Sequence, residues 1–144
     1  MTNHDSCVFC RPELEARQRA ILSNKSCIFY QMPQDILIGS GLIVPRQHRE
    51  NVFELTEQEW ADTYQLVHKV KAHLDELHQP DGYNLQWNTQ GAAGQHLFHS
   101  HLHIIPRFAD EPLAGKDLRS FLGKEDNRRP SLAANHLQHE IPHN

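Results

Sequence analysis

The stretch GAAGQHLFHSHLHIIPRF, residues 91–108, places three histidines at alternate positions: His99, His101 and His103. The chain has 12 histidines among 144 residues, so chance produces such a pattern about 0.08 times per chain. The spacing is therefore suggestive, and the neighbouring residues have to decide what it means.

The residues between the histidines indicate how this stretch sits in a fold. On a β-strand alternate side chains share a face, so the three imidazoles are expected on one side. Ser100, Leu102 and Ile104 then face the other side, where the two aliphatic residues can enter a core. The sequence therefore predicts a strand over 97–106 whose histidines line a cleft.

A long helix is predicted upstream, between Thr56 and His78. Thr56 and Glu59 form a capping box, in which each side chain bonds the backbone amide of the other residue. Apolar residues then recur at spacings of three and four along one face. They are Trp60, Tyr64, Val67, Val70, Leu74 and Leu77.

The remaining segments predict an α+β fold with a mainly antiparallel sheet. A shorter helix is expected over Glu13 to Leu22. The expected strands cluster before and after the long helix rather than alternating with it, which favours antiparallel pairing. Besides 97–106, they cover residues 26–32, 35–40, 41–45 and 83–88.

Composition and charge exclude several classes of protein. A net charge of −4 argues against a DNA, RNA or membrane partner, each of which favours a basic surface. No apolar run is long enough for a membrane span, and the first residues do not form a secretory signal. Three cysteines make no disulfide framework, so a cytoplasmic, reduced protein is expected. One domain over 1–110 is predicted, with a C-terminal extension over 111–144 whose last residues are flexible.

A loop rich in small residues, 88–95, directly precedes the histidine strand. Backbone amides in such a loop can approach an anion closely, and Asn88 and Gln95 add uncharged donors. An imidazole beside this loop suits nucleophilic attack on phosphorus. Two alternatives remain open: a three-histidine zinc site, and histidines that make only ordinary hydrogen bonds.

The stretch GQHLFHSHLHIIPR, 94–107, resembles the histidine triad (HIT) family, in which hydrophobic residues separate three histidines after a Gly-Gln loop. Ser100 departs from the first hydrophobic position. Upstream, GSGLIVPRQHRENVFEL (39–55) resembles the strand and turn that lead into the long helix of the family. The resemblance runs from about Cys7 to Arg107. It implies a HIT-like α+β fold that forms a homodimer, and an enzyme that hydrolyses or transfers nucleotidyl groups.

The resemblance also implies roles for individual residues. The middle histidine, His101, attacks the α-phosphorus of a nucleotide, and water then releases a nucleoside monophosphate without any metal in the chemistry. His99 matches the histidine that orients its neighbour. A hydrolase of phosphoanhydride or phosphoramidate bonds is the leading expectation. A nucleotidyltransferase or phosphorylase, and a non-catalytic nucleotide-binding regulator, are the alternatives. The positions that match phosphate-binding residues are Asn88, Gly94, Gln95 and His103.

Besides Ser100, three further features depart from the family pattern. His96 stands where the family often has Ser or Thr to assist the leaving group, and an imidazole there either donates the proton or lies in solvent. Ser40 replaces the histidine of the Gly-His pair. The segment 30–33, Tyr-Gln-Met-Pro, has no carboxylate where the family often contacts the ribose.

Cys7 and Cys10 form a CxxC pair, which fits half a zinc site, a redox pair or an accident. Apart from Met1, only polar residues precede Cys7, whereas a thioredoxin-like redox motif follows a strand. Tetrahedral zinc needs two further ligands. In bacterial HIT proteins that this chain resembles, they match His48 and His99. The resemblance thus implies a structural zinc ion that ties the N-terminus to the triad.

Overall fold

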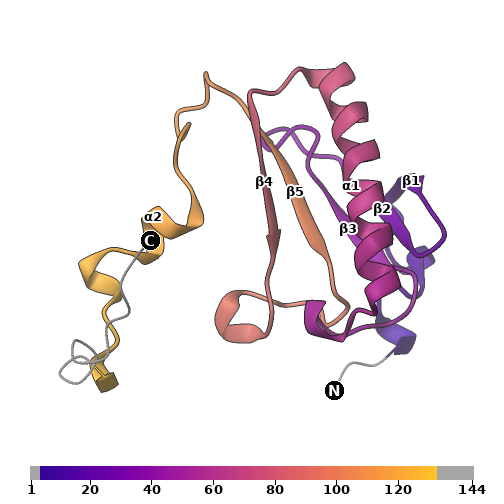
Figure 1. The fold of residues 1–144 in the computed structure, drawn as a ribbon, viewed down its shortest axis with the longest axis horizontal. Coiled ribbons are helices and arrows are strands. Elements are labelled where there is room, and N and C mark those ends of the chain that lie inside the picture. Colours follow the sequence, from indigo (N-terminus) through magenta and orange to yellow (C-terminus); the bar gives the residue numbers. More distant parts are fainter. Residues whose placement is uncertain (1–3, 133–144) are drawn as a thin grey trace. The chain divides into compact units, whose positions relative to one another are not determined.

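The computed structural model describes residues 4–132 and contains one five-stranded antiparallel sheet. The sheet has the order β1-β2-β3-β5-β4, with every neighbouring pair antiparallel. With one long helix beside it, this confirms the predicted α+β class (Figure 1). The strands are Arg19–Ser23 (β1), Cys27–Gln31 (β2), Gly41–Pro45 (β3), Gly82–Trp87 (β4) and Leu102–Arg107 (β5).

The helix α1, Glu57–His78, begins at the predicted capping box. Thr56 Oγ1 accepts the Glu59 amide at 3.1 Å, and Glu59 Oε1 accepts the Thr56 amide at 2.8 Å. The helix lies along β2 and β3 (Figure 1). Its buried face differs in part from the predicted one, because Trp60 and Tyr64 are 46% and 63% exposed. The residues that do enter the core are Thr63, Leu66, Val70 and Leu74.

Three local predictions were wrong. The expected helix over 13–22 is a short 3-10 turn, Pro12–Leu14, followed by β1, because β1 completes its backbone hydrogen bonds by pairing with β2. The expected strand over 35–40 is a bent loop that ends at Gly39, whose φ of 85° breaks an extended chain. The strand expected over 97–106 begins only at Leu102, because the Ser100 amide bonds the Arg49 carbonyl, outside the sheet ladder.

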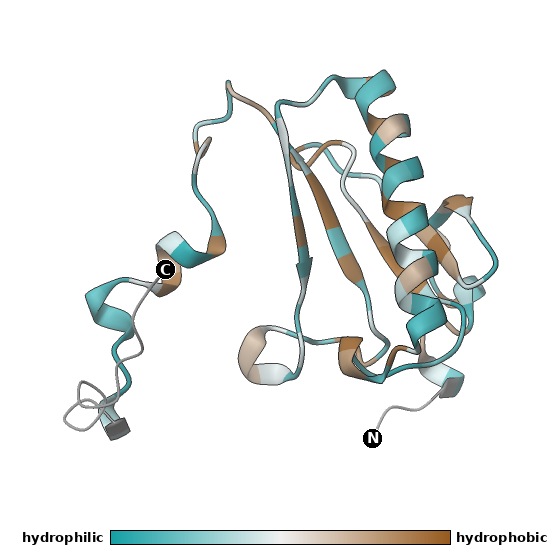
Figure 2. Ribbon diagram, viewed as in Figure 1, coloured by the Kyte–Doolittle hydropathy of each residue, from teal (hydrophilic) through white to brown (hydrophobic). Residues whose placement is uncertain are grey.

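Apolar residues cover both faces of the sheet. Between sheet and α1, the buried strand residues Phe29, Ile43, Leu102 and Ile104 pack together with the helix, as predicted for the last two. Figure 2 shows these brown segments of β3 and β5 beside α1. On the other face, a smaller apolar cluster forms where the N-terminal segment packs against β2 and β3. Its buried members are Cys7, Phe9, Tyr30 and Val44.

The chain divides into two compact units, one up to Ala109 and one from Asp110. Within the second unit the only α-helix among the described residues is α2, Leu118–Leu122. None of the helices in residues 4–132 has the length and apolar content needed to cross a bilayer. The predicted flexible end lies, from residue 133 on, outside the described residues. The 3-10 turns are His4–Ser6, Pro12–Leu14, Val52–Glu54, Gly91–Ala93, Glu125–Asn127 and Pro130–Leu132.

Candidate functional site

His101 lies immediately before β5 and is only 8% exposed. Its Nδ1 is 2.8 Å from the His99 carbonyl oxygen, so Nδ1 carries the proton and donates it. The lone pair of the neutral ring is then on Nε2. Burial lowers the pKa of His101, although the bond to His99 opposes the shift. The ring is therefore neutral near pH 7 and has a nucleophilic nitrogen.

His103 is the second residue of β5 and is half-buried beside His101, with 5.0 Å between the two ring centroids. Burial lowers its pKa, and the proximity of His101 lowers it further. Leu102 and Ile104, on the opposite face, are buried against the helix. The alternation predicted from the sequence therefore holds along β5.

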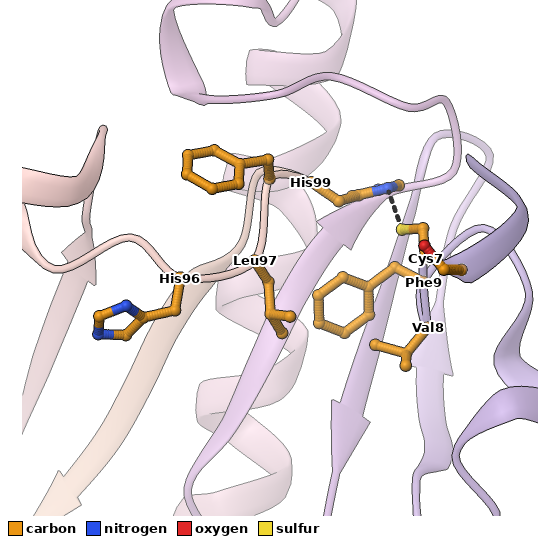
Figure 3. A pocket seen from close by; sticks show the side chains of 8 residues that line it. Cys7, Val8, Phe9, His96, Leu97 and His99 are labelled. Atoms are coloured by element: carbon orange, nitrogen blue, oxygen red, sulfur yellow. Dashed lines mark hydrogen bonds between the residues drawn. The ribbon is translucent and has the colours of Figure 1, made fainter. Parts of the chain in front are cut away.

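His99 is fully buried and faces the N-terminal segment rather than the other two imidazoles. Its Nε2 donates to the Pro45 carbonyl at 2.8 Å, which leaves Nδ1 as an acceptor. That Nδ1 is 3.4 Å from Cys7 Sγ, 3.5 Å from Cys10 Sγ and 3.2 Å from His48 Nδ1. Figure 3 shows the Cys7–His99 contact from close by.

Cys7, Cys10, His48 and His99 together form a group that is able to bind a metal ion. One donor atom from each lies within 4.8 Å of all the others, and Cys10 Sγ is 3.1 Å from His48 Nδ1. In tetrahedral zinc sites, ligand atoms lie about 3.3–3.8 Å apart, given the usual Zn–N and Zn–S bond lengths. The donor set, the spacing and the deprotonated Nδ1 of His99 all fit zinc.

The Cys10 thiol of this group is protonated near neutral pH unless a cation binds. Burial raises the pKa of Cys10 to about 11, and the neighbouring Cys7 adds to the rise. A bound cation opposes both effects, because it stabilises the thiolate. Metal binding and loss of the thiol protons are therefore linked.

The three triad imidazoles do not converge on one point. His99 turns its Nδ1 to the thiols, whereas His101 turns its Nδ1 to a backbone carbonyl. A three-histidine zinc site needs a ring nitrogen of each histidine on one ion. The geometry therefore disfavours that alternative.

Residues 45–50, between β3 and α1, hold the triad segment in place through their backbone. Besides the Pro45 carbonyl, the Arg49 carbonyl accepts the Ser100 amide at 2.6 Å. Arg49 in turn bonds Glu59, with Nε 3.0 Å from Oε1, so this segment is fixed to the start of α1. Burial by itself raises the pKa of Glu59, but the bonds from Arg49 and Thr56 outweigh it and lower the pKa.

The loop 88–95 brings Asn88 and Gly94 together. Gly94 has a φ of 95°, and a Cβ at this position would lie 3.6 Å from Asn88 Nδ2. Gln86, paired with His103 across the sheet, donates to Asn88 Oδ1 at 2.7 Å. This bond fixes the orientation of the Asn88 amide, so that its NH2 group is presented beside Gly94.

Gln95, predicted to bind phosphate, is 2% exposed and its amide is engaged with the backbone. Its Nε2 donates to the Glu50 carbonyl at 2.5 Å and to the Leu97 carbonyl at 3.0 Å. Its Oε1 accepts the Gln90 amide at 2.8 Å. The side chain therefore fixes the loop, and the backbone amide of Gln95 does the same, because it donates to the Gln90 carbonyl at 3.0 Å.

His96, the predicted leaving-group residue, is exposed. It borders a cavity of about 240 Å³ between residues 6–9 and 96–99. Its imidazole points away from Cys7 and His99, whereas Leu97 points toward Phe9 (Figure 3). The metal group lies on the opposite side of this cavity from His96.

Phe9, between the two cysteines, contacts His101 and was not predicted as a site residue. Its ring centroid is 5.7 Å from that of His101 and 6.1 Å from that of Tyr30, on which it stacks. Pro45 and Arg49 were also missed, because they act through carbonyls that every residue possesses. For Phe9, its place inside the CxxC pair was the available signal.

The open antiparallel sheet, the single long helix and the histidine segment beside a glycine loop define the histidine triad class of protein. The sequence model of the HIT domain matches residues 13–110, and this chain belongs to the HIT family.

Three curated proteins are similar in sequence. An uncharacterized HIT-like protein of Saccharolobus solfataricus is 32% identical over 113 residues, covering 77% of this chain and 81% of that protein. An adenylylsulfatase of Arabidopsis thaliana is 29% identical over 143 residues, covering 94% and 72%. An adenosine 5'-monophosphoramidase of Schizosaccharomyces pombe is 34% identical over 73 residues, covering 51% and 52%.

Two solved structures share the fold. A zinc-bound histidine triad family protein of Mycobacterium smegmatis has a TM-score of 0.67 at 24% identity, covering 96% of this chain and 100% of that one. A diadenosine triphosphate hydrolase of Plasmodium falciparum has a TM-score of 0.60 at 21% identity, covering 64% and 63%. At these identities the likeness establishes the fold.

Proposed function

We propose that the protein is a nucleotide hydrolase that cleaves a phosphoanhydride or phosphoramidate bond at the α-phosphorus. One observation carries the proposal: the bond from His101 Nδ1 to the His99 carbonyl leaves a neutral ring with its lone pair on Nε2. A buried, neutral imidazole held in one tautomer is suited to nucleophilic catalysis. The family membership and the names of the adenylylsulfatase and the phosphoramidase support this class of substrate.

The reaction proceeds in two displacements. In the first, His101 Nε2 bonds to the α-phosphorus, and the bond from phosphorus to the leaving oxygen or nitrogen breaks with its electron pair on the leaving atom. The leaving atom takes up a proton, which His96 supplies under this proposal. In the second displacement, water attacks the phosphorus and gives up one proton, which restores the proton that His96 lost in the first step. The P–N bond to His101 breaks with its electron pair on Nε2, and a nucleoside monophosphate departs.

The remaining site residues bind the phosphate. Asn88 donates hydrogen bonds to the non-bridging oxygens, and His103 lies beside His101 on the same face. The amides of Gly94 and Gln95 already donate to the Gly91 and Gln90 carbonyls, so these two residues hold the shape of the loop that presents Asn88. His99 positions His101 through its carbonyl while its own ring faces the metal group. Zn²⁺ held by Cys7, Cys10, His48 and His99 has a structural role in this proposal.

Turnover of adenosine 5'-phosphoramidate and of a diadenosine polyphosphate, with AMP quantified, tests the proposal. We expect AMP release by the wild type and a loss of more than about a hundredfold in His101→Ala. His68→Ala, which removes an exposed histidine on α1, serves as the matched control. Wild-type turnover in His101→Ala would overturn the assignment. Formation of a nucleoside diphosphate in added inorganic phosphate would indicate a phosphorylase instead.

We also propose a homodimer formed through α1 and the edge strand β4. An apolar groove of about 240 Å³ lies between them, and several of its lining residues are exposed. Within residues 4–132, β4 pairs on one side only, which leaves a row of backbone groups for a second copy. The groove is lined by Trp60, Thr63, Tyr64, Val67, Leu85, Trp87 and Leu102.

A further inference from the structure

The face of the sheet that carries His103 continues with polar side chains on β4. Tyr83 and Trp87 pack toward the helix side, so the alternate residues Asn84 and Gln86 point to the triad side. Gln86 pairs with His103 across the sheet, and Asn84 pairs with Ile105. The side-chain amides of Gln86 and Asn84 therefore lie beside β5 on the face that carries His103, at increasing distance from His101.

Arg107 lies at the far end of this face. It follows His103 by four residues on β5, so the two side chains share a side, with about 13 Å between their Cα atoms. Its Nη1 donates to Asn84 Oδ1 at 2.7 Å. Since Asn84 lies opposite Ile105, this bond draws the half-buried guanidinium back along the sheet toward His103.

We infer that Arg107 and Asn84 form a leaving-group subsite, which binds the phosphates of the substrate that lie beyond the α-phosphate. The inference rests on the proposed attack by His101. A guanidinium has five N–H donors in a planar fork that matches phosphate oxygens. The hydrogen bond to Asn84 Oδ1 fixes the orientation of the Arg107 guanidinium, and the NH2 group of Asn84 adds uncharged donors.

The charge that develops in the first displacement explains why a cation is useful there. When the bond from the α-phosphorus to the bridging oxygen breaks, the electron pair stays on that oxygen and the departing phosphate chain gains negative charge. A cation placed along the path of this chain stabilises the departing group more than the ground state. A phosphoramidate has no such chain, since its leaving group is an amine. The subsite therefore selects nucleotides with a polyphosphate leaving group, of which dinucleoside polyphosphates are one kind.

Arg107 also has a simpler explanation, in which its bond to Asn84 only braces the edge strand β4 against β5. A brace affects every substrate alike, because it acts on the shape of the whole site. A subsite for the leaving group affects only substrates that have phosphates to place there. The ratio of two specificity constants separates the two roles.

The test compares kcat/KM for diadenosine tetraphosphate with kcat/KM for adenosine 5'-phosphoramidate in the wild type, Arg107→Gln and Arg107→Lys. Arg17→Gln, at an arginine that is 72% exposed, is the matched control. In Arg107→Gln we expect the ratio to fall by about tenfold or more, through a lower kcat as well as a higher KM for the tetraphosphate. In Arg107→Lys, which keeps the charge, we expect part of the ratio to return.

A second arm needs no turnover and measures the binding of inorganic tripolyphosphate by calorimetry. We expect Arg107→Gln to weaken it by about tenfold and Arg17→Gln to leave it unchanged. An unchanged ratio, or an equal loss for both nucleotides, overturns the subsite. If the wild type hydrolyses neither nucleotide, the proposed function fails. The tripolyphosphate arm still decides the subsite, since equal binding by wild type and Arg107→Gln rejects it.

Discussion

His99 serves two neighbouring parts of the site through different atoms. Its ring joins the thiols and His48, whereas its carbonyl holds the His101 ring in one tautomer. The Pro45 carbonyl accepts the hydrogen bond from Nε2, so both ring nitrogens have partners and the orientation of the imidazole is fixed. A buried histidine fixed at both nitrogens is therefore the link between the N-terminal segment and His101, the proposed nucleophile.

Gln95 shows how a site residue acts without touching a ligand through its side chain. Replacing it with leucine leaves the Glu50 and Leu97 carbonyls and the Gln90 amide without their partner. We expect Gln95→Leu to lower the free energy of unfolding by about 1–3 kcal/mol. Thermal denaturation measures this change. Gln65→Leu, at an exposed position on α1, is the control, and an equal effect of the two substitutions would reject the role of Gln95.

The nature of the site residues was predictable, but the atom that each one uses was not. Alternating histidines on a strand next to a glycine loop suggested a nucleophile on phosphorus, and the resemblance to bacterial HIT proteins suggested a metal at the CxxC pair. Carbonyl acceptors such as Pro45 and Arg49 leave no trace in a sequence, because every residue has one. For the same reason, the sequence did not reveal that the Gln95 amide bonds the backbone.

Three segments that lie almost entirely outside the strands and α-helices position the site. The N-terminal segment with Phe9, the segment 45–50 and the loop 88–95 all meet around residues 95–101. These segments lie beside the sheet. The segment 45–50 is held to the start of α1 by the ion pair between Arg49 and Glu59. Loops of this kind keep a fixed shape only when side chains or an ion tie them together.

The metal group at the N-terminal segment makes a direct prediction. Cys7→Ser removes one of two thiolate ligands, so we expect zinc content to fall from about one ion per chain toward zero. We expect the melting temperature to fall with it, because the ion ties residues 7–10 to His48 and His99. Elemental analysis and thermal denaturation measure the two effects.

Cys27→Ala is the matched control, since Cys27 is buried in the core on the helix side and lies outside the metal group. It is expected to lose stability while it keeps its zinc. Unchanged zinc content in Cys7→Ser would contradict the assignment, and so would the same loss of zinc in both variants.

The ion pair at the start of α1 predicts a pH dependence of stability. Glu59 has a lowered pKa in the folded state, so the stability it contributes is complete above its unfolded pKa of about 4.3. That contribution is lost as the pH falls through the lower folded pKa. We expect Glu59→Gln to be about 1–3 kcal/mol less stable than wild type at pH 7, with the gap closing in acid. Urea denaturation at pH 7 and pH 3.5 measures it.

Glu57→Gln, at an exposed position in the same helical turn, serves as the control for this experiment. A gap between Glu59→Gln and wild type that stays constant from pH 7 to pH 3.5 would be incompatible with a titrating carboxylate. The size of the gap at pH 7 then reports packing alone.

At the scale of the whole molecule, the helix and the α+β class were predicted from local sequence patterns. The wrong predictions concern segments whose structure depends on which other strand they pair with. The capping box and periodic apolar residues predicted α1 to within one residue, since a helix satisfies its own backbone. The segment of β1 was wrongly predicted as part of a helix, because the hydrogen-bond partners of a strand belong to another segment, here β2. Trp60 and Tyr64 belong to the apolar face predicted for the helix, but they are largely exposed. Their exposure beside β4 supports the proposed dimer.

The proposed dimer predicts a change in mass in solution. Leu85→Lys places a charge in the apolar groove beside α1, so we expect it to shift the protein from dimer to monomer. Light scattering coupled to gel filtration measures the mass. Ile36→Lys, which is 85% exposed in the loop between β2 and β3, is the control and should leave the dimer intact. A wild-type protein that is monomeric in solution would contradict the proposed dimer.

The most direct test of the account is the intact mass of the protein milliseconds after mixing with adenosine 5'-phosphoramidate and, separately, with diadenosine tetraphosphate. The account predicts a transient species heavier by one adenylyl group, which peptide mapping places on His101 and which His101→Ala does not form. AMP release at the wild-type rate without any adduct, or an adduct that persists in His101→Ala, would contradict the central claim that His101 Nε2 is the nucleophile.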